Sequence, residues 1–150
     1  MTTTNASHVR AELLGAWRLV TWQSIAEDGA IGYPLGEDAI GQLMYDDSDR
    51  VSAQLVRINR PRFASDDWQQ ASADEMCAAW PSYFGYFGTF TVDTEAAAVT
   101  HHIDAGWFPN LVGTEQVRRY KFEDGRLVLD ADTTWGRVRI IWEKLPVVAL

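Results

Sequence analysis

The chain has 150 residues, of which 47% are hydrophobic and 23% are charged. These values are typical of one folded globular domain and exclude a disordered or collagen-like chain. Acidic residues outnumber Lys and Arg by 21 to 13, which gives a formal net charge of −8. Because nucleic acids and anionic membranes are bound by clustered cations, we expect neither as a partner.

The N-terminal segment and the cysteine content indicate a cytoplasmic protein. The single cysteine, Cys77, cannot form an internal disulfide, and the first ten residues lack the apolar stretch of a secretory signal. No apolar run approaches the ~20 residues of a membrane helix. We therefore expect one domain over residues 1–150, with a flexible polar segment at residues 1–10.

Apolar residues recur mostly at every second position, in short runs separated by acidic or glycine-containing turns, which predicts antiparallel strands. Eight runs follow this pattern: 17–25, 41–45, 51–58, 84–92, 98–105, 115–123, 126–130 and 137–144. The strongest hairpin signal is the Asp-Gly pair at 124–125, because both positions tolerate positive φ.

Two hairpins assign residues to the faces of the sheet. A two-residue turn at 124–125 places Phe122 opposite Leu127 and Tyr120 opposite Leu129. If Val92 opposes Val99 in the preceding hairpin, Phe90 opposes His101, which puts His101 on the apolar face.

Residues 65–80 break the strand pattern and predict two short helices. Apolar residues are spaced by three to five positions, Ser72 and Glu75 have the spacing of a capping box, and Pro81 ends the second helix. We expect Cys77 to be a small buried residue of this helix. Because long insertions between strands are often lids, we expect this one to cover a barrel end as a mobile gate.

Eight antiparallel strands leave exposed edges unless the sheet closes on itself. We therefore predict an all-β fold: an antiparallel barrel of eight strands, or of nine or ten, with a short helical insertion around residues 65–80.

Gly15, Ala16 and Trp17 match the Gly-x-Trp signature of lipocalins, and the chain from about Leu13 to Glu143 resembles the bacterial and fungal lipocalin-like domain family. The matching stretches are GAWRLV (15–20), YPLGEDAIGQLMY (33–45), SAQL (52–55), YFGTFTVD (86–93), VTHHI (99–103) and FPNLVGTEQVRRYKF (108–122).

The resemblance implies a small barrel with a cavity for an apolar or aromatic molecule, and it implies no single reaction. It also implies that Trp17 packs at one barrel end beneath an arginine of the last strand, for which Arg137 and Arg139 are the candidates.

We expect no metal and no cofactor. Histidines 101 and 102 are neighbours in a strand, so they point to opposite faces and cannot share one ion. The sequence also lacks Cys-x-x-Cys, His-x-x-x-His and phosphate-loop patterns.

Polar residues on the apolar face are the candidate site. His101 can act as acid or base near neutrality, Arg118 can stabilise an oxyanion or enolate, and Tyr120 can donate a proton. Gln116 shares this face, and Gln54 on a neighbouring strand is a further candidate. The structural alternative pairs Arg118 with a nearby acid, Asp104 or Glu115, and leaves His101 as a satisfied core residue.

Aromatic residues complete the predicted ligand-binding set, either as the cavity wall or as a seal at a barrel end. They are Trp68, Trp80, Tyr86, Phe90, Trp107 and Phe108.

Three function classes follow from this pattern. The favoured one is a monomeric or homodimeric protein that binds a small hydrophobic or aromatic molecule inside the barrel. The second is a cofactor-independent isomerase, cyclase or dehydratase of an aromatic or polyketide-like secondary metabolite, which uses His101, Arg118 and Tyr120. The third is a filled barrel whose exposed aromatic residues bind another protein.

Overall fold

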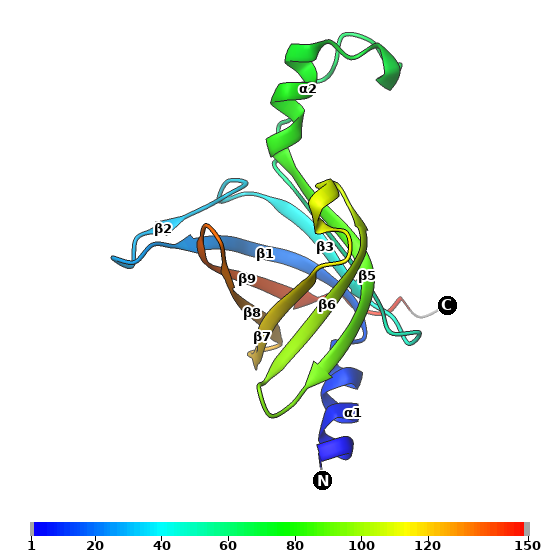
Figure 1. The fold of residues 1–150 in the computed structure, drawn as a ribbon, viewed down its shortest axis with the longest axis vertical. Helices are drawn as coiled ribbons and strands as arrows, with labels where there is room; N and C mark the ends of the chain where they lie inside the picture. The colour runs from blue at the N-terminus through cyan, green and yellow to red at the C-terminus, as the bar shows by residue number, and fades with distance from the viewer. Residues whose placement is uncertain (1, 149–150) are drawn as a thin grey trace.

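The structure is a computed structural model that describes residues 2–148, so residues 1, 149 and 150 of the predicted domain lie outside the described residues. Strands dominate it (Figure 1). In chain order the elements are α1 (Thr2–Leu13), β1 (Gly15–Ile25), β2 (Ile31–Gly32), β3 (Ile40–Tyr45), β4 (Arg50–Val56), the 3-10 turn η1 (Trp68–Gln70), α2 (Ala73–Ala79), η2 (Trp80–Ser82), β5 (Tyr83–Asp93), β6 (Ala98–Gly106), η3 (Pro109–Leu111), β7 (Glu115–Glu123), β8 (Arg126–Thr133) and β9 (Gly136–Lys144).

The sheet closes into a barrel, as predicted. Each strand from β3 to β9 pairs antiparallel with the next, and β1 pairs with both β3 and β9. Short β2 adds a ninth strand beside the end of β1. All eight predicted runs are strands, and their ends differ from the prediction by three residues at most.

The predicted registers are confirmed as well. Asp124 and Gly125 have φ of 52° and 74°, as a tight hairpin turn requires. Phe122 pairs with Leu127 across this turn, and Phe90 pairs with His101 in the preceding hairpin.

Helix α1 packs against one end of the barrel, which we call the helix end (Figure 1). Val9 and Leu13 are buried in the core, so the prediction of a flexible segment at residues 1–10 missed a helix. Two apolar positions four residues apart are too few to stand out in a polar segment.

Trp17 fixes the junction between α1 and β1. Its Nε1 donates a hydrogen bond to the Leu13 carbonyl at 2.8 Å. The cation over its ring is Lys144, with Nζ 4.5 Å from the centroid. The expectation of Arg137 or Arg139 was wrong because Arg139 forms a two-pronged ion pair with Asp130.

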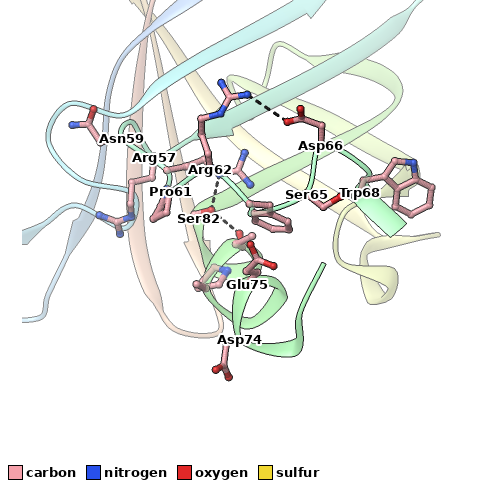
Figure 2. Close-up of a pocket in the computed structure, with 15 residues that line it drawn as sticks. Arg57, Asn59, Pro61, Arg62, Ser65, Asp66, Trp68, Asp74, Glu75 and Ser82 are labelled. Atoms are coloured by element: carbon pink, nitrogen blue, oxygen red, sulfur yellow. Dashed lines mark hydrogen bonds and ion pairs between the residues drawn. The ribbon is translucent and has the colours of Figure 1, made fainter. Parts of the chain in front are cut away.

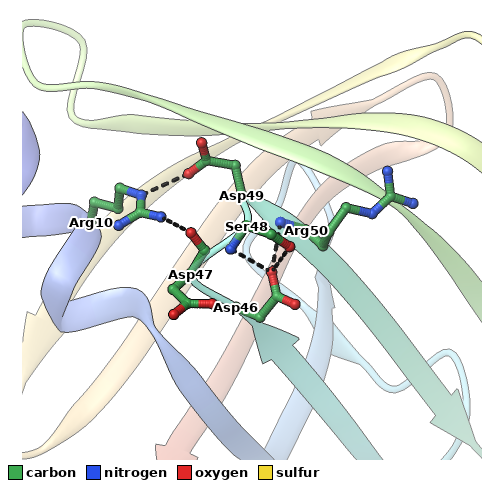
Figure 3. A network of polar contacts seen from close by, with 6 residues as sticks. All are labelled: Arg10, Asp46, Asp47, Ser48, Asp49 and Arg50. Carbon is green, nitrogen blue, oxygen red and sulfur yellow. Dashed lines mark hydrogen bonds and ion pairs between the residues drawn. The ribbon is translucent and has the colours of Figure 1, made fainter.

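Arg10 joins α1 to the turn between β3 and β4 (Figure 3). Its Nε lies 2.6 Å from a carboxylate oxygen of Asp49, and its Nη2 donates to the Asp47 carbonyl at 2.7 Å. Asp46 organises the turn by accepting from the hydroxyl and backbone of Ser48 and from the backbone of Arg50. These hydrogen bonds lower the pKa of Asp46.

Residues 57–82 between β4 and β5, which we call the arm, project away from the barrel in Figure 1. The two predicted helical pieces exist, and the capping box of Ser72 and Glu75 is complete. No residue of η1 or α2 is buried, and Cys77 is exposed. The expectations of a cover over the barrel end and of a buried Cys77 were therefore wrong, because the spaced apolar residues face solvent.

Candidate functional site

A buried polar cluster lies inside the barrel and is centred on His101 of β6. The His101 side chain is only 1% exposed. Its Nε2 lies 2.7 Å from the hydroxyl oxygen of Tyr45 on β3, and its Nδ1 lies 2.5 Å from that of Tyr86 on β5. The imidazole therefore bridges two phenols from different strands.

Strand pairing brings these side chains together. Tyr86 and Phe90 alternate inward along β5, with Gly88 between them. A Cβ at Gly88 would lie 1.8 Å from the backbone oxygen of His102, so only glycine allows the close approach of β5 and β6 where their register shifts. The shift leaves Phe90 opposite His101 on the inner face.

Burial keeps all three groups of the bridge uncharged. Burial lowers the pKa of His101 well below its usual value, and the positive charge of Arg118 lowers it further. Burial also raises the pKa of Tyr45 and of Tyr86, against an opposing effect of Arg118. At neutral pH the site therefore holds a neutral imidazole and two protonated phenols.

Arg118 on β7 adds a permanent positive charge to this interior. It is 6% exposed, and its Nη1 donates a hydrogen bond to the Val117 carbonyl at 3.4 Å. The acids expected as its partners are engaged elsewhere: Asp104 pairs with Arg50 at 2.9 Å, and Glu115 pairs with His102 at 3.4 Å. Within residues 2–148, no carboxylate lies within 4 Å of the guanidinium, so the structural alternative of an interior ion pair is wrong.

Two buried indole groups are also without partners. Nε1 of Trp22 and Nε1 of Trp142 are enclosed and have no hydrogen-bond acceptor among the described residues. Buried polar groups are usually satisfied, so each is an exception that needs an explanation. Both are donors, as is the Arg118 guanidinium.

Aromatic rings run from the loop end, the barrel end opposite α1, to the polar cluster. Trp107 lies 5.1 Å from Phe84 between ring centroids, Phe84 lies 5.8 Å from Tyr86, and Tyr86 lies 5.7 Å from His101. Tyr45 continues the series at 5.5 Å from His101. The rings therefore pack on one another in a continuous aromatic series from the loop end to His101.

The structure brings several of the predicted site residues together. Gln116 pairs with His101 across β6 and β7, faces inward and donates to the Thr114 hydroxyl at 3.0 Å. At the loop end Trp80 stacks on Trp107 with centroids 4.9 Å apart, and Phe108 lies 5.8 Å from Trp107.

Two predicted site residues lie outside the barrel interior. Gln54 is on the outer face of β4, where it accepts a hydrogen bond from Tyr83, because Val51, Ala53 and Leu55 are the inward residues of that strand. Trp68 is 81% exposed on the arm.

Tyr120 faces inward but lies nearer the helix end and packs on Phe122, 5.8 Å away. No hydrogen bond among the described residues joins it to His101. Its pKa is raised by burial and by the charges of Asp93 and Glu12, which are not part of the cluster. Tyr45 and Tyr86 occupy the place at His101 that was expected for Tyr120.

Sequence reasoning missed Tyr45, although a signal for it existed. Tyr45 follows Leu43 by two positions in a short alternating run, which places both on one face. The acidic turn at 46–49 has no two-residue hairpin signature, so the register of β3 and β4 was not assigned.

A hollow of about 730 Å³ lies outside the barrel and is lined by residues of the arm (Figure 2). Arg60 Nε donates to the Ser82 hydroxyl at 2.9 Å, and the Ala64 backbone donates to Glu75 at 2.8 Å. The wall of this hollow carries both positive and negative side chains, and Arg62 lies 3.8 Å from Asp66. It lacks the buried unpaired charge of the barrel interior and is therefore the weaker candidate.

Neither a metal cluster nor a membrane-spanning helix is found in the described part of the chain. Within residues 2–148, no three His, Cys, Asp or Glu side chains gather where they would hold a metal ion. No helix in this part of the chain combines the length and the apolar character needed to cross a bilayer.

The lipocalin-like domain family profile matches residues 14–145. A 4′-hydroxy-3′-methoxypropiophenone carrier protein of Aspergillus oryzae is 30% identical over 108 residues, which is 64% of this chain and 97% of that protein. Similar solved structures include a redesigned β-barrel (TM-score 0.44, 13% identity, 91% of this chain and 95% of that one) and the REP1-NXSQ fatty acid transporter (TM-score 0.45, 11% identity, 92% and 99%).

Proposed function

This chain belongs to the lipocalin-like domain family, and from that premise we propose that it binds a small hydrophobic or aromatic molecule inside its barrel. The observation that carries the proposal is Arg118, a buried guanidinium without a carboxylate partner among residues 2–148. An uncompensated buried charge costs several kcal/mol, so a filled structural barrel would have no use for it. A ligand site has a use for such a charge, because a few convergent donors orient a bound molecule.

The arrangement of the interior supports an aromatic ligand with one polar end. The ring would lie along the aromatic path from Trp107 through Phe84, and its oxygen would meet Arg118 and the bridged phenols. The Aspergillus oryzae relative is named as a carrier of an aryl ketone. We propose the same general role here, the carriage of an aromatic compound that bears a carbonyl or phenol oxygen.

The test is calorimetric titration with 4′-hydroxy-3′-methoxypropiophenone of the wild type and of two Tyr→Phe variants. Tyr86→Phe removes an inner hydroxyl and should weaken binding by about 0.5–1.5 kcal/mol, or about 2- to 12-fold. Tyr83→Phe removes an outer hydroxyl on the same strand and should leave affinity unchanged. Equal effects of the two variants would contradict an interior site.

A second function, cofactor-independent acid–base catalysis, is favoured by one observation. His101 touches two phenols, so its neutral imidazole can take a proton from one side and release one to the other. Chromatography of the compound after prolonged incubation separates the two functions. Unchanged compound supports carriage, whereas a product that disappears with His101→Gln supports an isomerase, cyclase or dehydratase.

A further inference from the structure

We propose that the molecule bound inside the barrel is a monoanion whose charged oxygen, a phenolate or carboxylate, is held by Arg118 and by a tyrosine hydroxyl of the His101 cluster. This inference rests on the proposed function and adds the charge and the donor set of the ligand. It follows from the sum of charges and from the number of hydrogen-bond donors in the interior.

The net charge of the buried polar cluster, including Arg118, is one positive unit. Among the groups that act on His101, Tyr45 and Tyr86, Arg118 is the buried ion, because the imidazole and both phenols are neutral. The inner faces of β6 and β7 present Val99, His101 and Gln116 beside it, with no acid. A single negative charge on a ligand would complete this interior, which a neutral ligand cannot do.

The hydrogen-bond count points to the same ligand. Tyr45, His101 and Tyr86 together carry three polar protons, and the two contacts between them use two. Neutral imidazole accepts through only one nitrogen, so whichever way the bridge is oriented, one phenol keeps a free O–H. Among the described residues, no further acceptor contacts either hydroxyl.

Every unpartnered polar group of the interior is thus a donor. The free phenol O–H belongs to the cluster and lies with the Arg118 guanidinium, one N–H of which donates to the Val117 carbonyl at 3.4 Å. The indole N–H groups of Trp22 and Trp142 lie elsewhere in the core. Donors that converge on a charged oxygen form the shorter and stronger class of hydrogen bond. A hydrocarbon or an ammonium ion, which has no acceptor atom, would leave these groups unsatisfied.

The test compares 4-hydroxyacetophenone with 4-methoxyacetophenone, which has the same ring and ketone but no acidic proton. The phenolate absorbs at longer wavelength than the phenol, so a pH titration with excess protein reports the pKa of the bound ligand. Binding as the anion releases the phenol proton to solvent and should lower that pKa by about one unit or more, a tenfold preference for the phenolate. The methyl ether should bind at least tenfold more weakly than the phenolate.

Two adjacent arginines provide the matched control. Arg118→Met should abolish the shift of the ligand pKa, whereas Arg119→Met removes an outward arginine that pairs with Asp132 and should preserve the shift. Arg118→Lys keeps the charge and should retain part of the shift, which guards against a folding defect in Arg118→Met.

The possible failures are distinguishable. If both ketones bind equally well and the phenol pKa is unchanged or raised, the anion inference is overturned and the proposed function stands. The inference is also overturned if Arg118→Met and Arg119→Met give the same shift. If neither of these ketones nor 4′-hydroxy-3′-methoxypropiophenone binds, the proposed function itself fails.

Discussion

The helix end of the barrel is tied to the core, whereas the arm at the loop end is tied mainly to itself. At the helix end, Leu13 is fully buried and Trp17 joins α1 to β1. On the arm, η1 and α2 bury no residue, and polar contacts such as Glu75 with Ala64 hold the segment to itself. The comparison indicates that folding free energy is concentrated at the helix end.

The site spans the distance between these two regions. Tyr45 ends β3 next to the turn that Arg10 holds, whereas Trp107 lies at the loop end beside Trp80. The polar part of the site thus lies towards the helix end, and its aromatic part reaches the base of the arm at Trp80.

The largest expected effect is at the helix end. Leu13→Ala should lower the free energy of unfolding by about 2–5 kcal/mol, because it leaves a cavity in the core. Met76→Ala on α2 removes an exposed side chain and should change the free energy of unfolding by about 0.5 kcal/mol or less. Urea denaturation measures both changes. Equal losses of unfolding free energy would contradict the difference between the two regions.

The next effect is a pH dependence that originates in the site. The pKa of His101 is lowered in the folded state. Below about pH 6.5 the imidazole is therefore protonated in the unfolded chain and still neutral in the folded chain. Stability contributed by this group is present above pH 6.5. It should be lost by about 1.4 kcal/mol per unit as pH falls towards the folded pKa.

Denaturation at several pH values between 4.5 and 8 checks this slope. His101→Gln should flatten it, whereas His102→Gln, which alters an outward side chain bonded to Thr91, should not. A slope that survives His101→Gln would show that the buried imidazole is not its source.

A smaller effect is expected where α1 meets the β3–β4 turn. Arg10→Ala breaks an ion pair with Asp49 that is partly exposed, so the loss should be about 0.2–1 kcal/mol. Arg62→Ala breaks the fully exposed pair with Asp66 on the arm and should have no measurable effect. Added salt should reduce the Arg10 effect, and a salt-independent loss would point to packing instead.

The barrel was predictable from the sequence because the features that specify it, alternation within strands and tight turns, are local. The Asp124-Gly125 turn fixed the β7–β8 register, and that register placed Arg118 on the inner face. Alternation also placed His101 inward. These conclusions needed only period two and one turn type.

The partners across the barrel were not predictable, because they depend on long-range placement. Tyr45 reaches His101 from 56 positions away, and Lys144 rather than Arg139 covers Trp17. The direction of the arm is likewise tertiary, since the apolar spacing of residues 65–80 fits a packed helix and an exposed one equally well. Tyr120 was assigned to the site because residues on one face of a strand were treated as one cluster.

The central claim is that Arg118 serves a ligand rather than the fold, and the melting temperature of unliganded Arg118→Met tests it most directly. Because the guanidinium has no carboxylate partner among residues 2–148, removing its charge should leave the melting temperature unchanged or higher than in the wild type. If Arg118 were a structural ion, the variant would leave a buried carboxylate without its ion-pair partner. The melting temperature would then fall by several degrees, at about 2–8 °C per kcal/mol for a domain of this size. A fall of that size would contradict the account.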